Sequence, residues 1–146
     1  MPLIGWAIST CDMSQPPEFS VIELNHVALS VSDVARSLPF YREVLGLEVI
    51  PRPNFPFPGA WFRLGHHQEL HLIGDQRLAA ASGHSMDGHF ALLVQDLAPV
   101  EARLRAAGVR FRGPGPRPDG ALQIFVADPD GNVIEFCSNL PNSRRN

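Results

Sequence analysis

The chain has 146 residues, of which 45% are hydrophobic, and a formal net charge of −3 at pH 7. That length fits about one domain with one ordinary core. The weakly acidic balance offers no basic surface for nucleic acid or an anionic membrane, and no apolar run approaches the roughly 18 residues of a membrane span. Two cysteines, Cys11 and Cys137, are too few for a disulfide framework, so we expect a cytoplasmic protein.

The first half of the chain predicts one strand, one helix and three further strands, after a flexible leader over residues 1–20. Ser32 or Asp33 caps the helix, and Gly46 ends it. Pro39 lies inside the helix and predicts a kink, because its nitrogen carries no hydrogen. A loop with four prolines follows and cannot form a central strand. The expected elements are a strand at 21–31, a helix at 34–45, strands at 47–50, 60–64 and 69–73, and the proline loop at 51–58.

The second half repeats this order after a linker at 76–87, and a frayed tail closes the chain at 139–146. Gly108 ends the second helix as Gly46 ends the first. The expected elements are strands at 89–94, 109–112, 121–127 and 133–137, a helix at 97–107, a glycine-proline loop at 113–120 and a tight turn at 128–132. We therefore expect an α+β fold in which two βαβββ modules, 21–75 and 88–138, form one domain with a cupped mixed sheet.

An internal repeat connects the two halves. HVALSVSDVA at 26–35 and HFALLVQDLA at 89–98 are identical at six of ten positions, at an offset of 63 residues. The last strand of each half gives a second match, since Glu135 follows His71 by 64 residues. If a pseudo-twofold axis relates the halves, His26 and His89 are symmetry mates, and so are His71 and Glu135. All four could converge on the concave side of the sheet.

This set of side chains predicts a metal site. Imidazole and carboxylate are ligands that divalent first-row metals accept, and the four groups together carry one negative charge. A single strand histidine is more often a half-buried residue with one hydrogen bond. Glu135, however, lies between Ile134 and Phe136 and is expected to be buried, where a carboxylate needs a cation. We predict one divalent ion (Zn, Ni, Mn or Fe) held by His26, His71, His89 and Glu135, with Glu69 as a competing fourth ligand.

Several stretches resemble the vicinal oxygen chelate superfamily, which contains glyoxalases, bleomycin-resistance proteins and extradiol dioxygenases. The resemblance spans about residues 21–138 and rests on NHVALSVSDVARSLPFYREVLGL, GAWFRLG, ELHLI, GHFALLVQDL and FVADPDGNVIEF. It implies paired βαβββ modules around a metal, with His26, His71, His89 and Glu135 at the ligand positions. In glyoxalase I-like members the last glutamate also carries the substrate proton, so the resemblance implies a catalytic role for Glu135.

The resemblance implies a metal-dependent lyase or isomerase that acts on a small carbonyl substrate through a metal-bound enediolate. Ser30 and Asp75 replace an arginine and an asparagine of bacterial glyoxalase I-like enzymes, which argues against glutathione. The alternatives are an Fe(II) ring-cleaving dioxygenase, which would use His26, His89 and Glu135, and a non-catalytic binding or resistance protein. A fosfomycin-type thiol transferase is a weaker fourth hypothesis.

Four further residues are candidates for the walls of a substrate pocket. Phe55, Phe57 and Trp61 could supply apolar contacts, although packing in the core or a loop is their more frequent role. Arg117, in the glycine-proline loop, could meet an anionic group, although a solvated arginine is the more frequent finding. Small members of the superfamily often place the metal between chains, so the resemblance also implies a homodimer.

Overall fold

The computed structural model describes residues 19–75 and 88–138. The predicted linker and tail, and most of the predicted leader, lie outside the described residues. Within the described part of the chain, no helix is long and apolar enough to cross a membrane. The first module contains β1 (His26–Val31), α1 (Val34–Pro39), a π-helical turn (Phe40–Val44), β2 (Val49–Ile50), β3 (Gly59–Leu64) and β4 (Gln68–Gly74). The second contains β5 (His89–Leu93), α2 (Ala98–Ala106), β6 (Phe111–Pro116), β7 (Leu122–Ala127) and β8 (Val133–Ser138).

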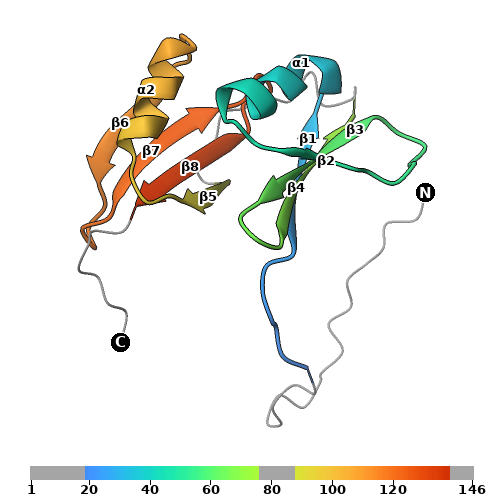
Figure 1. Ribbon diagram of the computed structural model, residues 1–146, viewed down its shortest axis with the longest axis horizontal. Coiled ribbons are helices and arrows are strands. Elements are labelled where there is room, and N and C mark those ends of the chain that lie inside the picture. Colours follow the sequence, from blue (N-terminus) through green and yellow to red (C-terminus); the bar gives the residue numbers. More distant parts are fainter. Residues whose placement is uncertain (1–18, 76–87, 139–146) are drawn as a thin grey trace.

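The predicted α+β fold of two βαβββ modules is confirmed. The strands form two four-stranded mixed sheets, ordered β1-β4-β3-β2 and β5-β8-β7-β6. In each sheet the first strand pairs in parallel with the last, and the other pairs are antiparallel. Figure 1 shows the two sheets next to each other, with α1 between them at the top of the view. Strands β1 and β5, which carry the repeated sequence, are therefore edge strands of their sheets.

The first helix follows the sequence signals and changes its hydrogen bonding at the proline. Asp33 is the cap, since its Oδ1 accepts hydrogen bonds from the backbone N–H groups of Ala35 (2.8 Å) and Arg36 (3.4 Å). The α-helix ends at Pro39, which lacks the N–H needed for the next bond, and the chain continues as a π-helical turn. Gly46, at a φ of +73°, then ends the helix as predicted.

Two strands differ from the expected ranges by more than two residues. The strand expected at 21–31 begins at His26, because β4 pairs with β1 only from Glu69 onward. Strand β6 includes two of the three prolines of the expected glycine-proline loop, Pro114 and Pro116. It lies at the edge of its sheet, where a missing N–H costs little, and its register with β7 shifts after Arg112.

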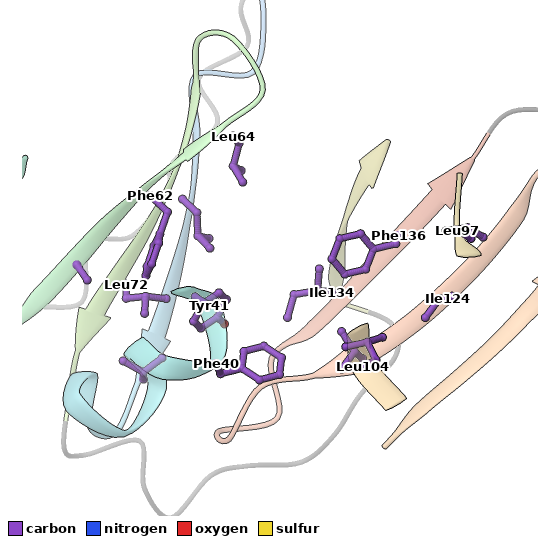
Figure 2. Close-up of a cluster of buried hydrophobic side chains, with 14 residues drawn as sticks. Phe40, Tyr41, Phe62, Leu64, Leu72, Leu97, Leu104, Ile124, Ile134 and Phe136 are labelled. Carbon is purple, nitrogen blue, oxygen red and sulfur yellow. The ribbon is translucent and has the colours of Figure 1, made fainter. Parts of the chain in front are cut away.

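One hydrophobic core joins the modules. Figure 2 shows Phe40 and Tyr41, from the π-helical turn, between the first sheet and the side chains of Ile134 and Leu104. Tyr41 and Ile134 are fully buried. The core also contains Phe62, Leu70 and Leu72 from the first sheet and Ile124, Val126 and Phe136 from the second. On the opposite faces of β1 and β5, alternate residues are exposed.

Polar contacts fix the turn before β8 against the junction of β1 and α1. The hydroxyl of Tyr41 donates to Oδ2 of the buried Asp128 at 2.7 Å. Asp130 accepts further hydrogen bonds from module 1, from the side chains of Ser32 (2.6 Å), Arg36 (2.6 Å) and Ser37 (3.2 Å). These contacts set the position of the strand that carries Glu135.

Candidate metal and substrate site

The first pair of predicted ligands, His26 and His71, lies on the exposed face of β1 and β4. Their rings stack with centroids 4.4 Å apart. Oε2 of Glu69 lies 2.8 Å from Nε2 of His71, so the competing ligand belongs to the same cluster. In the strand register His71 faces Ala28, and Glu135 faces Ala91 in the second module. The repeat-equivalent pairing that the sequence predicted is therefore present in the sheets.

The second pair, His89 and Glu135, lies on the corresponding face of β5 and β8. Nε2 of His89 is 2.9 Å from Oε2 of Glu135. The flanking residues Ile134 and Phe136 point into the core, as expected, and Glu135 itself is only 4% exposed. Its Oε1 is buried and has no hydrogen-bond partner within the described residues. A buried acceptor without a hydrogen-bond donor is costly in water-excluded surroundings, which fits an oxygen that binds a cation.

Arg117, a predicted pocket residue, lies beside this second pair. Its Nη1 is 3.9 Å from Oε1 of Glu135, while Nε and Nη2 donate to the two carboxylate oxygens of Asp119 at 2.8 and 2.7 Å. The hydrogen bond from Arg117 lowers the pKa of Asp119 to about 2 and raises the pKa of Arg117. Burial, followed by the charge of Glu135, raises the pKa of the nearby Cys137 thiol. The guanidinium cation of Arg117 therefore lies within reach of the candidate site.

The three predicted aromatic wall residues lie beside the first pair. Trp61 faces His71 in the register of β3 and β4, and the two rings stack at 4.0 Å with an interplanar angle of 7°. The ring centroid of Phe55 lies 6.1 Å from that of Trp61, and the ring centroid of Phe57 lies 5.2 Å from that of Phe55. Phe125 was not predicted as a site residue, but its ring centroid lies 5.5 Å from that of His89. The offset of 64 residues from Trp61 was the signal that could have identified it.

The structure does not bring the four predicted ligands of one chain together. Among residues 19–75 and 88–138, no group of three or more histidine, cysteine, aspartate or glutamate side chains could hold a metal ion. The first pair belongs to one sheet and the second pair to the other. Each module thus presents half of the predicted donor set on its open face.

Residues 23–136 match the family model described as Glyoxalase/Bleomycin resistance protein/Dioxygenase superfamily. The chain is 32% identical over 122 residues to Glyoxylase I 4 of Arabidopsis thaliana, and the matched region covers 79% of this chain and 70% of that protein. It is 32% identical over 124 residues to a probable lactoylglutathione lyase of Synechocystis sp., covering 77% and 92%. It is 33% identical over 115 residues to glutathione transferase FosA of Serratia marcescens, covering 77% and 78%. The chain spans about half the length of two other curated relatives, 44% of Lactoylglutathione lyase GLX1 from Arabidopsis thaliana and 49% of a putative lactoylglutathione lyase from Brassica oleracea.

Solved structures share the fold. A putative glyoxalase family protein from Bacillus anthracis is similar with a TM-score of 0.73 and 27% identity, covering 85% of this chain and all of that one. A mutant of the fosfomycin resistance protein FosX from Listeria monocytogenes, in complex with Mn(II) and a dihydroxypropylphosphonic acid, gives a TM-score of 0.69 at 19% identity, covering 86% and 98%. At that identity the second likeness shows the fold alone.

Proposed function

Because the chain belongs to the Glyoxalase/Bleomycin resistance protein/Dioxygenase superfamily, we propose that it is a metal-dependent lyase or isomerase of the glyoxalase type that acts on a small carbonyl substrate. The observation that carries this proposal is the buried carboxylate of Glu135, with His89 at one oxygen and no hydrogen-bond donor for the other among the described residues, where Nη1 of Arg117 lies 3.9 Å away. A divalent cation beside both side chains would compensate the buried charge. Relatives named as lactoylglutathione lyases support the same class of reaction.

The donor set proposed for the metal is His26, His71, His89 and Glu135. Imidazole nitrogens and a carboxylate oxygen suit Zn, Ni, Mn or Fe, and Glu69 is an alternative to His71. A bound divalent ion would polarise two adjacent substrate oxygens and so make the neighbouring C–H bond more acidic.

Glu135 is the proposed proton carrier. Its carboxylate would accept the proton from one substrate carbon and return it to the next, which needs a base in contact with the reacting atoms. Nε2 of His89 lies 2.9 Å from one oxygen of this carboxylate and Nη1 of Arg117 lies 3.9 Å from the other, so polar groups flank it on both sides.

We further propose that two copies of the chain complete the site. The two ligand pairs of one chain lie on separate sheets, and each pair lies next to an edge strand whose outer face is open. A homodimer that places the His26/His71 pair of one copy opposite the His89/Glu135 pair of the other would bring all four donors together twice. The dimer would also cover both edge strands, which are otherwise exposed to pairing with other chains.

The proposed substrate is a free carbonyl compound rather than a glutathione adduct, because Ser30 and Asp75 replace two residues of bacterial glyoxalase I-like enzymes. The test is conversion of an α-oxoaldehyde, with and without glutathione, by protein reconstituted with each of the four metals. Turnover without glutathione that is lost in Glu135→Gln supports the proposal. Turnover that requires glutathione would contradict the substrate assignment, and no turnover with any metal would contradict the lyase assignment.

A thiol transferase is the second candidate, favoured by the 33% identity to glutathione transferase FosA. The same reconstituted protein would then add a thiol to an epoxide-bearing phosphonate and leave the α-oxoaldehyde unchanged.

The cytoplasmic location of the protein stays a prediction.

A further inference from the structure

A row of aromatic rings leads from the first ligand pair to the proline-rich loop. The rings of His26, His71, Trp61, Phe55 and Phe57 follow one another with centroid distances of 4.4, 4.0, 6.1 and 5.2 Å. We infer that these rings form a wall selecting a substrate with a planar aromatic group attached to its pair of adjacent oxygens. This inference rests on the proposed function and assigns a substrate class to that site.

Trp61 lies on the ligand side of its sheet, not in the core. Along β3 the next residue, Phe62, is fully buried and packs in the core, so that Trp61 faces the opposite way. In the register Trp61 lies between Ile50 and His71. Its ring stacks face to face on the His71 imidazole, so the row of aromatic rings begins directly at the ligand pair.

The loop that carries the two phenylalanines is held in place by Arg52. Its Nη2 donates to the backbone oxygen of Phe57 at 2.9 Å, and its guanidinium carbon lies 4.9 and 5.0 Å from the ring centres of Phe55 and Phe57. Even so, the two phenylalanines are 40% and 39% exposed. Two large apolar rings are thus left open at fixed positions, and a ligand that covers them need not order the loop first.

The second module repeats this arrangement in a smaller form. Phe125 faces Glu135 in the register of β7 and β8, as Trp61 faces His71, and its ring meets that of His89 edge-on at 5.5 Å. Each ligand pair therefore has an aromatic ring at the equivalent position. In a site completed by two copies, Trp61 of one and Phe125 of the other would border the same substrate. Offset and edge-to-face contacts with both would favour an aryl group over an aliphatic group of equal bulk.

Hydroxamates test this inference, because their two adjacent oxygens bind divalent metals and their substituent can be varied. We would measure dissociation constants by calorimetry on the zinc-loaded full chain for benzohydroxamate, cyclohexanecarbohydroxamate and acetohydroxamate. We expect benzohydroxamate to bind about tenfold more tightly than either of the others, as one or two aromatic contacts would give. Phe55→Ala should lose most of that preference. Val49→Ala, which truncates a 46% exposed residue on the other face of its strand, should keep it.

The outcomes separate this inference from the proposed function. Equal affinities for the three compounds would overturn the aromatic preference and leave the metal site intact. Failure of all three to bind would overturn both proposals. If Phe55→Ala dissociates the oligomer and leaves the preference for benzohydroxamate unchanged, the loop packs on a second copy and the inference is wrong.

Discussion

Nε2 of His89 lies 2.9 Å from Oε2 of Glu135, although the two residues are 46 positions apart in the chain. They meet because β5 and β8 pair in parallel, with Ala91 in register with Glu135. The carboxylate is 4% exposed, and its second oxygen has no hydrogen-bond partner among the described residues. A buried carboxylate that is hydrogen-bonded at one oxygen only is the feature from which the proposed chemistry starts.

Glu135→Gln should weaken metal binding while keeping the fold. The amide has the same shape and can still meet His89, but it carries no charge, so we expect affinity for Zn²⁺ to fall by more than about tenfold. Without metal the variant should be at least as stable as the native protein, because burial of a carboxylate with one oxygen lacking a hydrogen-bond donor is costly. Competition with a chelating dye measures the affinity, and thermal melting measures the stability. Glu48→Gln, at an exposed surface pair with Arg63, is the matched control and should change neither.

Trp61 should report metal binding directly. Its ring stacks on that of His71 at 4.0 Å, and ions with partly filled d shells quench indole emission at such short range. The chain has two tryptophans, so Trp6→Phe leaves Trp61 as the reporter. Ni²⁺ or Co²⁺ should quench its fluorescence, whereas Zn²⁺, with a filled shell, should not. Quenching that persists in His71→Ala would contradict the assignment of His71 as a ligand.

Tyr41→Phe should destabilise the contact between the modules. The hydroxyl donates to Asp128 at 2.7 Å in a buried setting, and burial followed by the charge of Asp128 raises the pKa of Tyr41. We expect a loss of about 1–3 kcal/mol in the free energy of unfolding, measured in urea. Arg42→Ala removes an exposed ion pair with Glu43 and should cost less than about 1 kcal/mol. Equal losses in the two variants would show that the buried hydrogen bond is not important.

Because of Asp130, the free energy of unfolding should decrease in acid. Burial alone would raise its pKa, but hydrogen bonds from Ser32 and Arg36 outweigh burial and hold the pKa below the ordinary value of 3.8. A carboxyl whose pKa is lowered by folding stabilises the protein above its unfolded pKa, and this contribution disappears as the pH falls through the folded pKa. The free energy of unfolding of the native protein should therefore exceed that of Asp130→Asn at about pH 6, and the difference should shrink as the pH falls below 3.8. A constant difference over that range would contradict the assignment.

The sequence predicted the features that local chemistry and the repeat determine. Asp33 caps its helix, Gly46 and Gly108 adopt positive φ after theirs, and His71 and Glu135 occupy equivalent register positions. Each follows from a short pattern or from the 63- to 64-residue offset, without knowledge of how the modules pack.

Other features depend on contacts that a one-dimensional pattern does not contain. The prolines of β6 are tolerated because that strand lies at a sheet edge, which only the strand order reveals. The position of Arg52 over Phe55 and Phe57 depends on the path of the proline-rich loop. Likewise, the separation of the two ligand pairs depends on how the modules pack through Tyr41 and Asp128.

Metal content per chain tests the central claim most directly. It would be measured by elemental analysis of the full chain purified without added metal, beside His89→Ala and Glu135→Ala. We predict close to one divalent ion per chain in the native protein and loss of that ion in both variants. Native protein that contains no metal and takes up none from Zn²⁺, Ni²⁺, Mn²⁺ or Fe²⁺ would contradict the account.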